Sequence, residues 1–334
     1  MSRVKEDVWH QLLSEDIARG TTHAKPAEPQ VTDRLLAGMD HDRVRYLLIH
    51  IDAGSDEVHD NRSRGIRVTT EEMTIAGQEA GKYIVISCQQ PAGHEIFSIV
   101  GGELATALAR AEQTDSVCVE SVMSRFRYFW GQIPTTLLSK QRQIGLFGEL
   151  WFLLQWLAPE MEIEHAVDLW RGQQGARHDF EASNWSVEAK TTTSVRGQVH
   201  TVHGIEQLVP PEQGKLYLFA LQIREENGAS NTLPLLVASC RNKLINLNEA
   251  SLRFETALAS AGYSSEFDLE YSNRKFRIID EAAYIVEGDF PRLVPEQLKG
   301  GVLLEGVDSI KYQISLHGYS HLRVATESAE LPFL

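Results

Sequence analysis

The sequence predicts an α/β protein with a mixed central sheet flanked by helices, preceded by a smaller α+β domain. The chain has 334 residues, which exceeds one typical domain and fits two modest ones. Strand-like runs rich in Val, Ile and Tyr alternate with helical patterns along it. After residue 139 the order is helix, three strands and helix, which is typical of an α/β core.

Residues 1–135 are expected to form the accessory α+β domain. The chain opens with a helical pattern, and a polar stretch with two prolines then predicts a loop. Three strand-like runs bounded by Gly, Asp and Asn predict a small antiparallel sheet, and two helices follow. In order, these are the helix 1–20, the loop 21–33, the strands 44–52, 65–70 and 82–89, and the helices 97–112 and 116–131.

Residues 136–334 are expected to form the main domain. Its first helix ends at the Ala158-Pro159 step, a common stop signal. A loop rich in Gly and Gln separates this helix from two short strands with a turn at Asn184. In order, the elements are the helix 139–157, the loop 171–177, the strands 178–183, 185–192 and 215–223, the helix 248–261, and the strands 275–286 and 310–316.

Composition excludes several classes of protein. The polar N-terminal segment lacks the apolar core of a signal peptide, and no run of 18 apolar residues predicts a membrane span. Three scattered cysteines argue against a disulfide framework or zinc knuckle and fit a reducing cytoplasm. The net charge is −14, but residues 123–200 hold eight basic and eight acidic side chains and are locally neutral. Any nucleic-acid footprint should therefore be small, or a partner should help to engage the substrate.

Two adjacent strands carry a cluster of charged residues. In the run WSVEAK, Glu188 and Lys190 share one face of a strand, while Val187 and Ala189 share the other. In the run HDFEAS before it, Asp179 also lies on a polar face. If Asn184 makes a tight turn, the two strands form a hairpin in which Asp179 approaches Glu188.

The helix QIGLFGELWFLLQWL is apolar almost all round and is expected to be buried. Glu149 is its only acid, and a buried carboxylate needs a counter-charge, donors or a metal. Gly145 and Gly148 flank it and would let another backbone approach closely. Glu149 could instead serve a purely structural role in the core.

These residues suit a magnesium site. Mg²⁺ prefers oxygen ligands and usually takes one or two carboxylates, here Asp179 and Glu188, together with substrate phosphate. The backbone carbonyl of Ala189 could supply another oxygen, and Glu149 could complete the shell or hold Lys190. Such a metal, Mg²⁺ or Mn²⁺, would polarise a phosphodiester, and Lys190 would orient water or stabilise developing charge.

The string Asp179-x8-Glu188-Ala189-Lys190 resembles the signature of the PD-(D/E)xK nuclease superfamily, with His178 where that signature has proline. The runs SKQRQIGLFGELWFLL, HDFEASNWSVEAKTTT and HTVHGIEQL resemble more specifically a bacterial family of PD-(D/E)xK proteins found in restriction and phage-defence gene clusters. The resemblance covers residues 139–208. It implies a restriction-endonuclease-like fold, dependence on Mg²⁺ and a DNA substrate.

Residues around the motif are candidate nucleic-acid contacts. The resemblance places Gln207 where many members have a helix touching the site or DNA. Arg177 and Arg196 could bind phosphates, and Thr191 could donate to phosphate oxygens. His203 and its neighbour His200 are expected at the surface or on DNA. Each arginine could equally be a solvated charge, and the threonine an ordinary strand residue.

The function predicted from the sequence is that of a metal-dependent DNA endonuclease in a multi-protein bacterial restriction or anti-phage system. Its partners would be DNA and other subunits, such as an ATPase or a methyltransferase, and the sequence leaves a homodimer open. Two alternatives remain: a catalytically silent nuclease fold used as a DNA-binding or assembly platform, and an enzyme acting on RNA or nucleotides.

Overall fold

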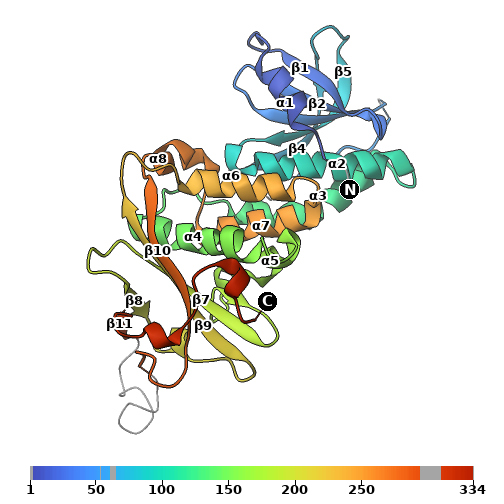
Figure 1. Cartoon of the computed structure of the whole chain (residues 1–334). Coiled ribbons are helices and arrows are strands. Elements are labelled where there is room, and N and C mark those ends of the chain that lie inside the picture. The colour runs from blue at the N-terminus through green and yellow to red at the C-terminus, as the bar shows by residue number, and fades with distance from the viewer. Residues whose placement is uncertain (1–2, 53, 61–64, 294–309, 334) are drawn as a thin grey trace. The chain divides into compact units, whose positions relative to one another are not determined.

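The computed structural model describes residues 3–52, 54–60, 65–293 and 310–333, which form two compact units (Figure 1). Each unit has its own sheet and helices, and the sheet of the second unit is mixed, so the predicted fold class is confirmed. The first unit comprises Met1–Thr135, Ile245–Ala259 and Ser264–Glu266, and the second comprises Thr136–Leu244, Ser260–Tyr263 and Phe267–Leu334.

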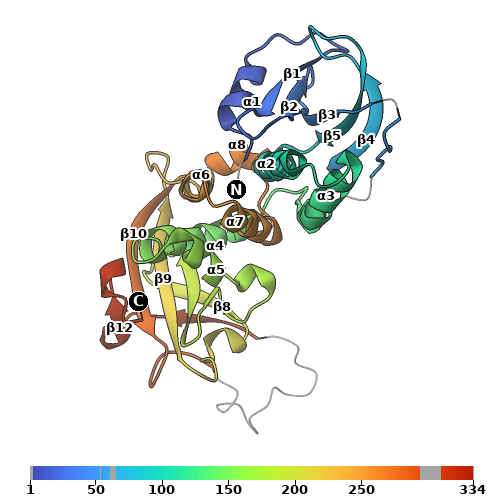
Figure 2. The same cartoon turned by 90° about the vertical axis from the view of Figure 1, so that its right-hand side faces the viewer.

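The first unit contains a five-stranded antiparallel sheet in the order β1-β2-β3-β5-β4. Helix α2 packs against β1 and β2, and α3 packs against α2 (Figure 2). The bounds are α1 Glu6–Leu13, β1 Thr22–Glu28, β2 Thr32–Asp40, β3 Arg45–His50, β4 Ile66–Met73, β5 Gly81–Cys88, α2 His94–Arg110 and α3 Asp115–Gln132.

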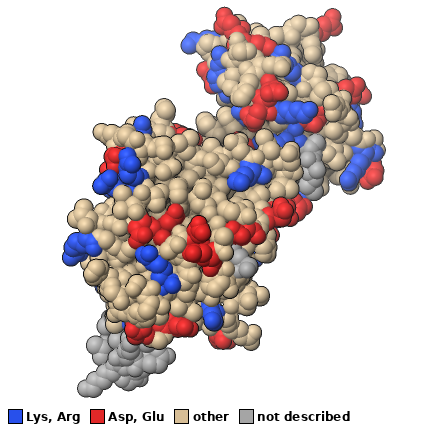
Figure 3. Space-filling model, viewed as in Figure 1, with Lys and Arg blue, Asp and Glu red and all other residues tan. Residues whose placement is uncertain are grey.

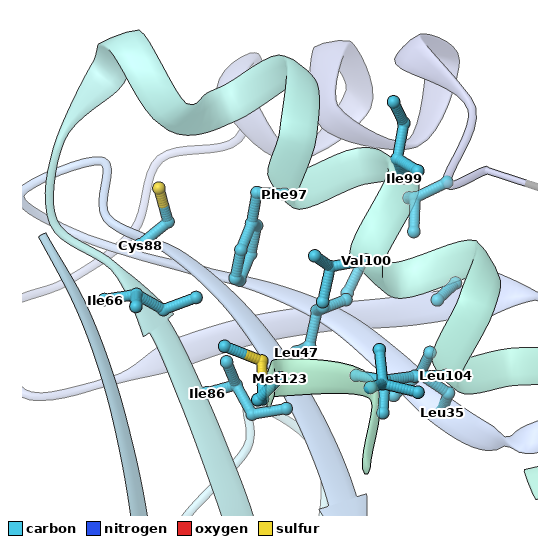
Figure 4. Close-up of a cluster of buried hydrophobic side chains, with 14 of the residues drawn as sticks. Leu35, Leu47, Ile66, Ile86, Cys88, Phe97, Ile99, Val100, Leu104 and Met123 are labelled. Carbon is cyan, nitrogen blue, oxygen red and sulfur yellow. The ribbon is translucent and has the colours of Figure 1, made fainter. Parts of the chain in front are cut away.

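The core of this unit lies between one face of the sheet and the helices. Leu47 of β3 and Ile86 of β5 meet Phe97 and Val100 of α2 and Met123 of α3 (Figure 4). Aromatic residues of α3 are part of this core, namely the buried Phe126, Phe129 and Trp130. A smaller cluster covers the other face of the sheet with Leu48, Ile75, Tyr83 and Val85.

Two sequence predictions for this unit were wrong. The first helix is shorter than 1–20: within the residues described, it runs only over Glu6–Leu13. The predicted loop 21–33 instead contains β1 and the start of β2. Pro26 had argued for a loop, but β1 is an edge strand with an irregular register between Pro26 and Glu28. An edge strand tolerates proline because one of its sides forms no ladder hydrogen bonds.

The second unit is built on a mixed sheet in the order β12-β10-β9-β7-β6. Strands β7 and β9 are parallel, and the other neighbours are antiparallel. A separate two-stranded sheet pairs β8 with β11. The bounds are β6 Phe180–Glu181, β7 Trp185–Thr192, β8 Val199–His203, β9 Lys215–Glu225, β10 Phe276–Ile285, β11 Lys311–Ser315 and β12 Arg323–Ala325.

Helices cover one face of this mixed sheet. The π-helical turn η2 continues α4, and α6 packs on both (Figures 1 and 2). Phe152 of α4 joins the two layers, with its ring centroid 5.0 Å from that of Phe180 and 4.8 Å from that of Phe219. The helix bounds are α4 Lys140–Phe152, η2 Leu153–Leu157, α5 Ile163–Leu169, α6 Leu233–Leu244 and α8 Asp268–Ser272. Helix α7, Asn248–Ala261, belongs to the first unit up to Ala259.

The other face of the sheet is covered by β8, β11 and the segments beside them. An apolar cluster joins the two sheets, and its members include Val202 of β8, Leu218 of β9, Tyr284 of β10 and Ile314 of β11. Because β7 is placed between this layer and α4, its two faces are enclosed by different elements.

The main elements predicted for residues 136–334 are present, with two differences. The strand predicted over 178–183 is reduced to the two residues of β6. Helices α5, α6 and α8 and strands β8 and β12 were not predicted. The three cysteines are free, in agreement with the prediction of no disulfide framework, and all three are buried. Within the residues that the structure describes, no helix has both the length and the apolar character needed to cross a bilayer.

Candidate active site

Strand β7 carries the central residues of the site. Val187 and Ala189 turn toward the helical layer, so Glu188 and Lys190 turn toward the other face. The antiparallel register of Phe180 with Val187 places Asp179, the residue before β6, opposite Glu188. The predicted hairpin and the predicted approach of these two acids are therefore both present.

The backbone N–H of Ala189 points toward the β6 side of β7, where Asp179 lies. The Ala189 N–H donates to Asp179 Oδ2 at 2.8 Å. In a strand the N–H and C=O of one residue point to the same side, so the Ala189 carbonyl also points toward this edge. No partner strand competes for it, because β6 consists only of Phe180 and Glu181.

Lys190 is held from two sides. Its Nζ lies 2.6 Å from Glu188 Oε1 and donates to Gln207 Oε1 at 3.0 Å. The same amide oxygen accepts the backbone N–H of His203 at 2.9 Å. Gln207 lies on the short 3₁₀ helix Glu206–Leu208, which follows β8. The ammonium group is thereby fixed beside Glu188.

Glu149 reaches the site from α4. It is buried, and its Oε2 accepts hydrogen bonds from Trp170 Nε1 at 2.8 Å and from Gln173 Nε2 at 2.7 Å. Both donors come from the segment between α5 and β6. This segment also holds Asp179, whose carbonyl accepts the backbone N–H groups of Arg171 and Gly172 at 2.8 and 3.0 Å.

Two glycines permit this close assembly. A Cβ on Gly148 of α4 would lie 1.7 Å from Thr191 Oγ1, so the absence of a side chain lets β7 approach the helix. A Cβ on Gly172 would lie 2.7 Å from Asp179 Oδ1 and 2.9 Å from Asp179 Cα. Gly145 meets nothing within 4 Å. The predicted close approach therefore holds for Gly148 and not for Gly145.

These groups line one pocket of about 390 Å³ in the second unit. Its walls come from α4, β7, β8 and the helix after β8. The lining residues are Gln141, Ile144, Gly145, Glu149, Asp179, Glu188, Ala189, Lys190, Thr191, Thr192, Thr193, Thr201, His203 and Gln207. The pocket thus contains all four predicted catalytic residues.

The site brings three carboxyl groups and one ammonium together in a largely buried setting. Burial, followed by repulsion from Asp179, raises the pKa of Glu149 and that of Glu188 to about 8. Burial also raises the pKa of Asp179. Burial alone would lower the pKa of Lys190, but the carboxylates of Glu188 and Asp179 outweigh it and raise that pKa. One ammonium therefore does not compensate three carboxylates.

This donor set fits a divalent cation. Within the described ranges, no three His, Cys, Asp or Glu side chains are gathered closely enough to form a metal centre by themselves. The residues that would hold Mg²⁺ are Asp179 and Glu188 together with the Ala189 carbonyl, and such a site needs few protein ligands because Mg²⁺ keeps several waters. The raised pKa values of Glu149, Asp179 and Glu188 also fit a cation site, because a bound cation would offset the repulsion between these carboxylates.

The predicted nucleic-acid contacts have different outcomes. Gln207 and His203 line the pocket, whereas Arg177 and Arg196 are exposed outside it. Thr191 faces α4, and its buried Oγ1 has no hydrogen-bond partner among the residues described. The prediction that His200 lies at the surface was wrong. His200 is 1% exposed, because it lies on the face of β8 that is covered by the mixed sheet.

Several contributors to the site were not predicted. Trp170 and Gln173 hold Glu149, and Gly172 touches Asp179. The Gly- and Gln-rich composition of 171–177 signalled a loop but not which groups it would contact. His178 is also buried and contacts the carbonyl of Val209 through Nε2 at 3.1 Å, in the position where the motif has proline.

The mixed sheet and the Asp, Glu and Lys residues at its edge define a protein of the PD-(D/E)xK nuclease-like class. The sequence profile of the family described as "Putative PD-(D/E)XK family member, (DUF4420)" matches residues 5–317, and the chain belongs to this family. The predicted resemblance to the PD-(D/E)xK superfamily is therefore confirmed. Members of the PD-(D/E)xK class generally use divalent metals. Comparisons with curated proteins and with solved structures find no match.

Proposed function

We propose that the protein is a metal-dependent DNA endonuclease that hydrolyses phosphodiester bonds. The observation that carries the proposal is the clustering of the buried Glu149 and Glu188 and the partly buried Asp179 around the ammonium of Lys190 in one pocket. Several carboxylates without enough counter-charge destabilise the folded protein. A bound cation would offset their charge, and such perturbed groups are typical of functional sites.

Each residue then has a role that follows from its position. Asp179, Glu188 and the Ala189 carbonyl would hold the cation, which supplies Lewis-acid polarisation of the phosphate and a water of lowered pKa. Lys190, fixed by Gln207, would donate to the attacking water or to the phosphate oxygen that gains negative charge. Glu149 would accept a proton from water or complete the ligand shell, in the orientation that Trp170 and Gln173 give it.

We propose further that the enzyme acts with partner subunits in a bacterial restriction or anti-phage system. The net charge of −14 opposes unaided capture of DNA. On the face shown in Figure 3, Lys and Arg are interspersed with Asp and Glu, and no broad positive field covers that face of either unit. A DNA-engaging partner, such as an ATPase or a methyltransferase subunit, would add to the weak affinity of the chain alone.

The test is cleavage of supercoiled plasmid by purified protein in Mg²⁺ or Mn²⁺, with the Lys190→Ala variant in parallel. Lys215→Ala is the matched control, because Lys215 is an exposed lysine at the start of β9. We expect the wild type and the control to nick or linearise the plasmid, and the Lys190 variant to lose at least 100-fold in rate, on the order expected for loss of a charge-stabilising donor. Cleavage of linear DNA with blocked ends, and of RNA of the same sequence, is measured in parallel. The first shows whether cutting is internal, and the second whether the substrate is DNA or RNA.

Equal cutting by wild type and Lys190→Ala would refute the assigned site. If wild-type protein binds Mn²⁺ through Asp179 and Glu188 but cuts only RNA, the enzyme class stands and the DNA substrate is wrong. If it neither cuts nor binds Mn²⁺, the fold serves as a platform, and the endonuclease proposal fails.

A further inference from the structure

We propose that the loop joining β7 to β8, residues 193–198, contacts duplex DNA beside the cleavage site and that Val195 inserts into a groove of the duplex. This β7–β8 loop follows directly on the strand that carries Glu188 and Lys190. The inference rests on the proposed function, because it assumes that DNA occupies the pocket.

The exposure of Val195 has no explanation within the fold. Its side chain is 97% exposed, more than any other large apolar residue in the described part of the chain. A lone apolar residue on a surface is common, but turns favour Gly, Asn, Asp, Pro and Ser. A β-branched residue at a turn tip serves neither turn geometry nor packing, so its exposed methyl groups are available for a contact outside the chain.

The pocket leads from the acidic residues to this loop. Its lining continues along β7 from Lys190 to Thr193, where the loop begins, and Thr201 and His203 of β8 line it too. Val195 follows Lys190 by five residues, which is at most about 16 Å of extended chain. Since successive nucleotides rise ~3.4 Å along a strand, Val195 would meet a duplex within roughly five base-pair steps of a phosphate at Lys190.

Hydrogen bonds define the conformation of the loop. Gln222 Nε2 of β9 donates to the Ser194 carbonyl at 2.9 Å, and the Ser194 N–H donates to Thr192 Oγ1 at 3.1 Å. The Arg196 N–H donates to Ser194 Oγ at 3.1 Å. A loop held in this way loses little conformational freedom when it binds, so the contact of its tip can contribute to affinity.

The charges carried by the loop itself also suit a polyanion. Residues 189–205 contain no Asp or Glu, although the chain has 46 acids in 334 residues. Asp280, whose Oδ2 accepts a hydrogen bond from Gln198 Nε2 of the loop at 2.9 Å, is paired with Arg323 at 3.4 Å. Arg196, next to Val195, is exposed and has no ion-pair partner among the residues described. An apolar side chain beside a free arginine matches the chemistry of groove insertion, in which the arginine binds backbone phosphate and the apolar group displaces groove water or opens a base step.

The test is binding of a fluorescein-labelled mixed-sequence DNA duplex, measured by anisotropy in Ca²⁺ to suppress turnover. The variants are Val195→Ser and Val195→Asn, both suited to a turn. Leu269→Ser is the matched control, because Leu269 of α8 is also highly exposed, at 83%, and does not line the pocket. We expect both Val195 variants to weaken duplex binding about tenfold, with Leu269→Ser unchanged, as loss of one buried valine contact implies. In cleavage, KM should rise while kcat stays constant.

Wild-type affinity in both Val195 variants, an equal loss in Leu269→Ser, or no binding of the duplex by wild-type protein would each overturn this inference. Its failure can be distinguished from that of the proposed function. Cleavage that needs Lys190 but not Val195 leaves the endonuclease standing without the inserted side chain. Duplex binding that needs Val195, without cleavage and without Mn²⁺ binding, supports the loop contact and refutes the endonuclease.

Discussion

Replacing Glu149 by glutamine should stabilise the metal-free protein, and the gain should grow with pH. The folded carboxyl has a pKa of about 8, against an ordinary value of 4.5, because it is buried and lies near Asp179. Between these values the folded state retains a proton that the unfolded state releases, so wild-type stability falls as pH rises. At pH 7, about 2.5 pH units above the ordinary value, the cost is about 3 kcal/mol at ~1.4 kcal/mol per unit.

The amide of the variant avoids this cost and keeps both hydrogen bonds. Its carbonyl can still accept from Trp170 Nε1 and Gln173 Nε2, which now contact Glu149 Oε2. The assay is thermal unfolding in chelator from pH 5 to 9. We expect Glu149→Gln and wild type to unfold together near pH 5 and to separate by roughly 6–12 °C at pH 7, at 2–4 °C per kcal/mol.

Glu281→Gln is the control, because Glu281 of β10 likewise accepts two indole N–H groups, from Trp151 and Trp156, at 2.7 and 2.8 Å. It reports what the change from carboxylate to amide does to such hydrogen bonds away from the acidic pocket. A separation between Glu149→Gln and wild type that does not widen with pH would refute the reasoning.

Four further outcomes follow from the site and its surroundings. Mn²⁺ should raise the melting temperature more at pH 8 than at pH 6, because the carboxyl protons must leave before the cation binds; an equal shift at both pH values would contradict this. Gly148→Ala should lower the free energy of unfolding in denaturant titrations by about 1–3 kcal/mol through its clash with Thr191, whereas Gly145→Ala, facing open space, should be neutral or stabilising. Gly172→Ala should displace Asp179, and calorimetry should then show at least tenfold weaker Mn²⁺ binding in a protein whose circular dichroism is native. Phe333→Ala should lower the free energy of unfolding by about 1–3 kcal/mol in urea titrations, since the Phe333 ring lies 4.4 and 4.5 Å from the rings of Trp185 and Tyr217.

The site could be predicted where it depends on local patterns. Alternation along WSVEAK fixes which side chains share a face, and an acid in an apolar helix must have a partner. The positions of Asp179, Glu188, Lys190 and Glu149 in one pocket follow from those two rules together with the turn at Asn184.

What could not be predicted depends on contacts between segments that are distant in the sequence. The identities of Trp170 and Gln173 do not predict that their N–H groups donate to Glu149. These contacts depend on how the chain runs from α5 back to β6. The edge position of β1, which lets it contain Pro26, is likewise a property of the sheet order. The burial of His200 was not predicted because the packing of one face of β8 on the mixed sheet, seen for Val202, has no local signal in the sequence.

Because β6 has only two residues, the sheet is less stable than it could be, but the backbone of Ala189 is left available to the site. A longer β6 would continue the ladder along β7, add main-chain hydrogen bonds and protect a strand edge from unwanted pairing. It would also engage the N–H and C=O of Ala189, the first of which now serves the Asp179 carboxyl. Substitutions selected only for thermal stability would therefore be expected to close this gap in the ladder and to weaken the proposed metal site, because the Ala189 carbonyl is part of that proposed site.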